Sequence, residues 1–141
     1  MKPPVTAPRT PCLCIALRRS AQKVTEWYDE ALKPTGITVN QYSLLANIDR
    51  MEGCGTGELA QRVKLEKSTL VRTLHPLLRD GLILDNAPAT SRRRQLFVSP
   101  RGRDVLKKAF PLWELAQKRI ALALGENHAA LMDIFARLDE A

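Results

Sequence analysis

Two groups of polar and cationic side chains have the types and spacing needed to bind an anionic polymer. The first is Lys67, Ser68, Thr69 and Arg72, at the start of a predicted helix. Residues four apart on a helix share a face, so Ser68 and Arg72 can point outward together. An arginine guanidinium can bond a guanine edge at two places at once. We therefore expect this group to contact double-stranded DNA, with Arg72 reading a base.

The second group is three consecutive arginines, Arg92, Arg93 and Arg94, in a predicted hairpin. Arginines on a projecting ribbon can enter a minor groove or bind phosphates. Loop arginines are usually only solvated, but a hairpin that directly follows the helix of Arg72 favours DNA contact. Strand alternation predicts Arg92 and Arg94 on one side and Arg93 on the other.

The charge distribution agrees with these two groups. The 141-residue chain has a net charge of +7 and a pI near 9.7. Residues 61–108 hold 12 lysines and arginines against four acidic residues, so the positive excess lies in one third of the chain. A local excess of this kind indicates an anionic partner.

Apolar periodicity and capping signals predict the helices that position the first group. A helix is expected over 12–32, and Thr38 with Gln41 forms a capping box for a second helix over 39–51. Thr56 is expected to cap a two-turn helix ending near Val63. After a tight turn, a fourth helix begins near residue 66 or 67. Two short helices joined so tightly are typical of a helix-turn-helix.

The fourth predicted helix carries an apolar stripe and one irregular residue. Its inward positions are expected to be Leu70, Val71, Leu74, Leu77 and Leu78. Pro76 lies inside it and predicts a kink at residue 75 or 76, because proline removes a helical hydrogen bond. Gly81 is expected to end the helix in a left-handed conformation.

Two strands and two further helices complete the expected fold. Strands are predicted over 82–85 and 95–98, and Ser99 followed by Pro100 begins a helix of about 24 residues. A last helix starts near Asn127. The sequence thus predicts a mainly α protein with a small β-hairpin wing, in which apolar faces of the first and the two terminal helices bury by homodimerisation.

One domain is expected over 1–141. Its DNA-binding lobe is 38–99, and its dimerisation helices are 10–35 and 100–141. No apolar run approaches the roughly 18 residues of a membrane span, and 1–11 lacks the apolar core of a signal peptide, so we expect a cytoplasmic protein without membrane contact.

The sequence speaks against catalysis, a cofactor and a metal. His75 and His128 have no ligand at metal-binding spacing, and no glycine-rich phosphate loop is present. Cys12 and Cys14 are one residue closer than a C-x-x-C redox pair. We expect no enzyme, no cofactor and no metal site.

The ordered motifs resemble the multiple-antibiotic-resistance regulator (MarR) family of bacterial winged-helix repressors and activators. The resemblance extends from about residue 11 to 136. It rests on GITVNQYSLLANI, TGELAQRVKLEKSTLVRTLHPLLRDGLI, RRRQLFVSPRGRDVL and PLWELAQ. The family's wing commonly carries Asp-x-Arg, whereas the matching stretch 87–89 has neither charge, so the wing contact passes to Arg92–Arg94.

The resemblance implies two ways to release DNA. Cys14 near a helix start, with Tyr28 further along, is similar to the branch that senses organic hydroperoxides, in which a low-pKa thiol is oxidised. The alternative is that Cys14 is a small hydrophobe buried at the dimer contact. Other family members bind small aromatic acids, for which Trp27, Tyr28, Tyr42 and Arg18 are the expected pocket, or else the aromatics are plain core.

The expected function is sequence-specific binding of duplex DNA by a transcriptional repressor, released by a small ligand or by thiol oxidation. The alternative is a sequence-neutral architectural protein that binds phosphates alone. The ratio of specific to non-specific affinity separates the two.

Overall fold

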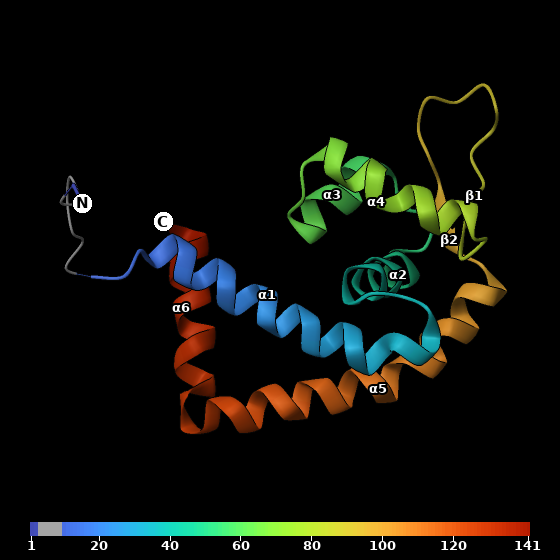
Figure 1. Cartoon of the computed structure of the whole chain (residues 1–141). Coiled ribbons are helices and arrows are strands. Elements are labelled where there is room, and N and C mark those ends of the chain that lie inside the picture. The colour runs from blue at the N-terminus through green and yellow to red at the C-terminus, as the bar shows by residue number, and fades with distance from the viewer. Residues whose placement is uncertain (3–9) are drawn as a thin grey trace.

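The fold is a mostly helical chain with one two-stranded hairpin, seen in a computed structural model that describes residues 1–2 and 10–141. This confirms the predicted fold class (Figure 1). The elements are α1 (Leu13–Leu32), η1 (Lys33–Thr35), α2 (Val39–Met51), α3 (Thr56–Val63), α4 (Lys67–Arg79), β1 (Ile83–Asp85), β2 (Leu96–Val98), α5 (Pro100–Leu124), η2 (Gly125–Asn127) and α6 (His128–Glu140).

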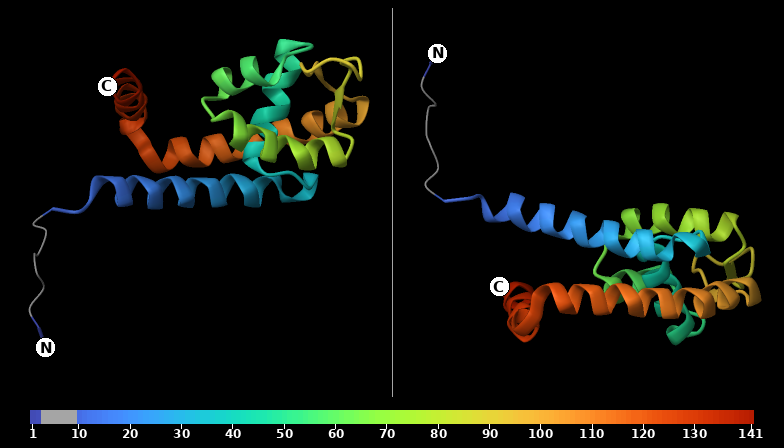
Figure 2. Two further views of the ribbon diagram at one scale, coloured as in Figure 1. Left: turned by 90° about the horizontal axis from the view of Figure 1, so that it is seen from above. Right: turned by 60° about the horizontal axis from the view of Figure 1, so that its bottom comes forward.

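The two long helices α1 and α5 lie side by side and run in opposite directions (Figures 1 and 2). Tyr28 of α1 donates a hydrogen bond from its hydroxyl to the Gln117 side chain of α5. One turn earlier, the guanidinium of Arg119 lies 4.2 Å from the ring centroid of Trp27. These contacts make the helix pair a base on which α2, α3 and α4 rest.

Helix α2 begins as the sequence predicts, and α3 does not. Thr38 accepts a bond from the Gln41 amide, and the Gln41 side chain accepts one from the Thr38 amide, which completes the capping box. In α3, Gly55 occupies the N-cap position and Thr56 is already helical, with no capping hydrogen bond from a side chain. The prediction that Thr56 caps this helix was wrong, because the extended backbone before it continues through Gly55.

Helix α4 ends in a tight C-terminal turn that sends the chain into the hairpin. Gly81 has a φ of 77 − 5 = 72°; its amide donates to Leu78, and the Leu82 amide donates 2.9 Å to the Leu77 carbonyl. This pair of bonds is the Schellman motif, so the left-handed role predicted for Gly81 is confirmed. The helix continues through Pro76 to Arg79, and the kink there stays a prediction.

The hairpin pairs Ile83 with Val98 and Asp85 with Leu96, one residue shorter on each strand than predicted. A third segment joins it, because the Leu96 amide donates 2.9 Å to the Cys54 carbonyl. The wing is therefore held by the turn between α2 and α3.

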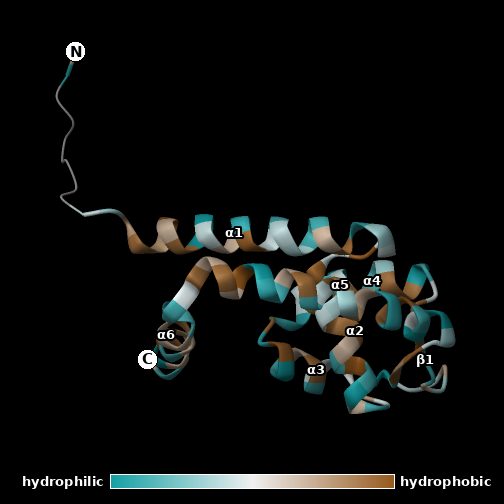
Figure 3. Ribbon diagram, turned by 90° about the horizontal axis from the view of Figure 1, so that it is seen from below, coloured by the Kyte–Doolittle hydropathy of each residue, from teal (hydrophilic) through white to brown (hydrophobic). Residues whose placement is uncertain are grey.

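A single core lies under the helix-turn-helix and the base of the wing. It runs along the chain from Leu32 to Ala109, with α4 contributing Leu70, Leu74 and Leu77. The outer parts of α1, α5 and α6 lie outside it, and apolar residues remain uncovered there (Figure 3). The most exposed of these are Leu13, Leu17, Leu115, Leu122, Met132 and Leu138.

Candidate nucleic-acid interface

Helix α4 presents a polar face opposite its buried leucines. With 3.6 residues per turn, burial of Leu70, Leu74 and Leu77 turns Ser68 and Arg72 outward, and both are exposed. His75 is exposed on the same face, one turn beyond Arg72. The sequence showed this position only as a neighbour of Pro76, although its spacing from Ser68 and Arg72 already placed it on their face.

The remaining residues of the first predicted group lie around the start of α4. Lys67 is exposed in the first turn, and Thr69 is half-buried on the flank facing α2. Glu66 occupies the N-cap position without a capping hydrogen bond from its side chain, and the first turn holds no acidic residue. The first amides of a helix have no partner within the helix, so this end suits an anion such as a phosphate.

Val71 corrects the predicted apolar stripe of α4. It was expected to point inward, but its side chain is 41% exposed. Leu70 and Leu74 fix the buried direction of the helix, and Val71 lies one residue, about 100° of rotation, away from Leu70. Val71 therefore faces the side of α4 that also bears Arg72.

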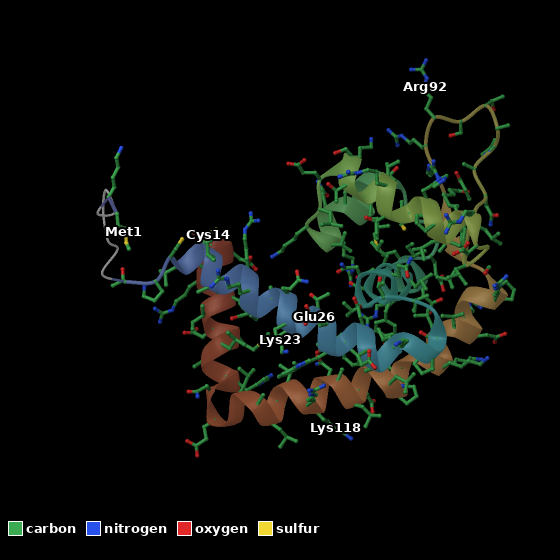
Figure 4. The ribbon with its side chains drawn as sticks, in the orientation of Figure 1. Met1, Cys14, Lys23, Glu26, Arg92 and Lys118 are labelled. Atoms are coloured by element: carbon green, nitrogen blue, oxygen red, sulfur yellow. The ribbon has the colours of Figure 1, made fainter. Side chains whose placement is uncertain are left out.

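The three wing arginines lie in a loop rather than on a strand. Strand β2 begins only at Leu96, so the alternation predicted for Arg92, Arg93 and Arg94 has no strand to impose it. Arg92 and Arg93 are exposed and Arg94 is half-buried. Arg92 projects from the outer part of the wing, away from the rest of the molecule (Figure 4).

A concave surface brings the wing arginines and the start of α4 together. Arg92, Arg93 and Arg94 line it with Lys67, and the turn and first residues of α3 at 55–58 form its floor. Its volume is about 550 Å³. Four cations face one acidic side chain there, Glu58, so the hollow attracts anions. The two groups predicted from the sequence thus meet at one surface.

Asp85 fastens the wing loop at its base. Its Oδ1 accepts hydrogen bonds from the amides of Ala87 and Gln95, each 3.0 Å long. Partial burial by itself raises the pKa of this carboxyl, but the two amide donors and the nearby charge of Arg94 outweigh it and lower the pKa. The ionised carboxylate therefore holds the two ends of the arginine loop together at neutral pH.

The cysteines differ sharply in exposure. Cys12 and Cys14 are exposed at the start of α1, and Cys54 is buried. Burial, and then the charge of Glu58, raise the pKa of the Cys54 thiol. Fourteen residues of helix separate Cys14 from Tyr28, about 21 Å, and the Tyr28 hydroxyl is bonded to Gln117. Within one chain the two predicted sensor residues do not meet.

The predicted aromatic-acid pocket is also not assembled within one chain. Trp27 lies against Arg119, Tyr28 bonds Gln117, and Tyr42 stacks on Trp113 with ring centroids 5.8 Å apart. Arg18 is exposed on α1, about 15 Å of helix from Tyr28. The three rings mainly fasten α1 and α2 to α5, as in the plain-core alternative.

Two wider searches of residues 1–2 and 10–141 gave negative results. No three His, Cys, Asp or Glu side chains gather there as ligands for a metal ion. None of the helices in this part of the chain has the length and apolar character that would let it traverse a bilayer.

The helix-turn-helix of α3 and α4, followed by a hairpin rich in arginine, defines the chain as a winged-helix protein of the DNA-binding class. The sequence profile of the MarR family matches residues 37–94. A crystal structure of the Mycobacterium tuberculosis transcriptional regulator MosR in complex with DNA is 35% identical, with a TM-score of 0.82 over 92% of this chain and 95% of that chain. The chain belongs to the MarR family of DNA-binding transcriptional regulators.

Two further solved structures resemble this chain. The transcriptional repressor CouR bound to p-coumaroyl-CoA is 26% identical, with a TM-score of 0.81 over 91% of each chain. The Staphylococcus aureus MepR–DNA complex is 17% identical, with a TM-score of 0.78 over 94% of this chain and all of that chain, and it shows the fold alone. No curated protein sequence matches the chain.

Proposed function

We propose that this protein is a homodimeric repressor that recognises a specific sequence in duplex DNA through α4 and the wing. The observation that carries the proposal is the meeting of Lys67 and the three wing arginines at one hollow, beside the outward face of Ser68 and Arg72. In this arrangement α4 enters the major groove, where Arg72 bonds a guanine. The wing arginines bind the adjacent minor groove or its phosphates.

The decisive measurement is a ratio of affinities. Fluorescence anisotropy would compare duplexes selected by the protein from a random library, or taken from upstream of its own gene, with a scrambled duplex of equal length. We expect a preference of about 10³ or more for the selected duplex. Equal weak binding to every duplex would instead support the architectural alternative.

Replacing Arg72 with alanine tests base reading directly. The variant should lose about 1–3 kcal/mol of binding free energy on the selected site and little on scrambled DNA, because a base contact is lost while phosphate contacts remain. Arg19→Ala on α1 removes an equally exposed arginine far from α4 and serves as the control. An equal loss on both duplexes would make Arg72 a phosphate contact.

Homodimerisation is supported by apolar side chains that no part of the described chain covers. α6 buries none of its residues, although Ile134, Phe135 and Leu138 are 45–56% exposed and share one face of it. Leu122 near the end of α5 is 84% exposed. A second copy of the chain would bury these faces, as expected for a protein whose site is a two-fold symmetric DNA.

The double variant Leu122→Lys, Phe135→Lys should therefore dissociate into monomers. Burying two charges in an apolar contact should raise the dimer dissociation constant at least roughly 100-fold. Analytical ultracentrifugation at micromolar concentration measures this. Leu84→Lys, on the exposed edge of the wing, is the matched control and should stay dimeric. A wild-type monomer would overturn the dimer.

Release from DNA by oxidation of Cys14 is supported by the exposure of this thiol at the first turn of α1. The Cys14 thiolate attacks a peroxide oxygen, the O–O bond breaks, the alcohol leaves with a proton, and a sulfenic acid remains. Cys14→Ser should keep DNA binding and lose release by cumene hydroperoxide. Release that persists in this variant would favour a small-molecule effector, in line with the p-coumaroyl-CoA bound by CouR.

A further inference from the structure

The outward side of α4 carries one apolar side chain beside the arginine that would read a base. Val71 is 41% exposed, and it precedes Arg72 in the chain. Single exposed apolar residues are common and need no explanation by themselves. Val71, however, lines a hollow of about 290 Å³ together with Leu78, Arg72, His75 and Arg94. This hollow lies between the recognition face and the inner end of the wing loop.

The composition of the hollow fits the edge of a base pair. Val71 and Leu78 form its apolar part, while Arg72, His75 and Arg94 supply hydrogen-bond donors around it. In the major groove thymine alone among the four bases presents a methyl group, next to the polar edges of the neighbouring bases. A surface that pairs an apolar patch with an adjacent arginine is complementary to a thymine beside a guanine.

We propose that Val71 reads the C5 methyl group of a thymine located next to the base that Arg72 contacts. The inference rests on the proposed function, since it requires α4 to lie in the major groove. It adds a rule of specificity: each half-site contains a thymine whose methyl group, rather than its hydrogen-bonding edge, is recognised.

The geometry of the helix supports neighbouring contacts by these two residues. Consecutive residues of a helix are 1.5 Å apart along its axis, and consecutive base pairs are 3.4 Å apart. Side chains at 71 and 72 therefore reach the same base pair or adjacent ones. Valine in a helix has one strongly preferred rotamer, so its two methyl groups are fixed before DNA arrives.

The test removes the methyl group from the DNA and the side chain from the protein in turn. In a duplex selected by the wild-type protein, each thymine is replaced singly by deoxyuridine, which lacks only that methyl. We expect one replacement per half-site to weaken binding about four-fold, the effect of one buried methyl group. Val71→Ala should bind the thymine and deoxyuridine duplexes equally at that position.

Two further variants complete the cycle. Val24→Ala removes the same atoms from a half-exposed valine of α1 and should keep the wild-type sensitivity to deoxyuridine. Val71→Thr keeps one methyl group and should retain part of that sensitivity. Thermal melting of each variant checks that the fold is intact.

The outcomes separate this inference from the proposed function. A selected site whose thymines can all be replaced without loss would overturn the role of Val71 and leave specific binding standing. The same holds if Val71→Ala stays as sensitive as the wild type. Failure of the library to yield any preferred duplex would overturn the proposed function, and the inference with it.

Discussion

Alanine at all three of Arg92, Arg93 and Arg94 should weaken binding to selected and scrambled DNA alike, by about 10²- to 10³-fold at 0.1 M salt. Each phosphate contact releases about 0.9 counterions, so three lost contacts lower the slope of log K against log salt by about 2.7. Fluorescence anisotropy at several salt concentrations measures both quantities. The effect is large because these arginines line one hollow with Lys67.

A charge-matched variant shows whether position or net charge causes this loss. The triple variant Arg18→Ala, Arg19→Ala, Lys23→Ala removes three exposed cations from α1, so its net charge equals that of the wing variant. It should keep a salt slope close to that of the wild type. If both triple variants lose the same slope, general attraction to a basic protein would account for binding, and the wing would have no specific contact.

Gly102→Ala should lower the free energy of unfolding by about 3 kcal/mol and the melting temperature by about 10 °C. A Cβ atom at Gly102 would lie 2.1 Å from the carbonyl oxygen of Leu82 and 2.7 Å from Cγ1 of Val98. Rotating a side chain cannot relieve the first clash, because the oxygen belongs to the backbone. That same oxygen accepts a bond from the Ser99 amide, and the Ser99 hydroxyl joins Gly81 to the Gly102 amide.

Gly57→Ala is the matched control for this substitution. Gly57 lies in α3, and a Cβ atom there would have no other atom within 4 Å. Alanine favours a helix over glycine, so this variant should gain about 0.5–1 kcal/mol. Differential scanning calorimetry of both proteins makes the comparison. Equal melting temperatures for the two variants would mean that the start of α5 shifts away from Leu82 at little cost.

The helices and the hairpin were predictable because their signals are local. The capping box of Thr38 and Gln41, the left-handed Gly81 and the Ser99–Pro100 start all involve residues within a few positions of one another. Thr56 failed as a cap because the preceding backbone is set by distant pairing: Cys54 bonds Leu96 of the wing. A local sequence window does not contain that partner.

The candidate site was predictable by residue type more than by geometry. Arg72 and the three wing arginines were found because clustered cations are visible in the sequence. Val71 was misplaced, because a stripe of consecutive apolar residues does not say which one lies at its edge. The roles of Trp27 and Tyr28 depend on α5, about 90 residues away, where Arg119 and Gln117 meet them.

Helix α5 is a lever as well as a support. It runs without a break for 25 residues, about 37 Å, from the end of the wing to the uncovered apolar face near Leu122. Pro111 lies within it and has no amide proton to give the Lys107 carbonyl, so bending resistance is lowest there. A bend of about 10° at Pro111 would displace the far end by about 3 Å, close to the rise of one base pair. A small deflection of this rod would be enough to put two DNA-reading lobes out of step.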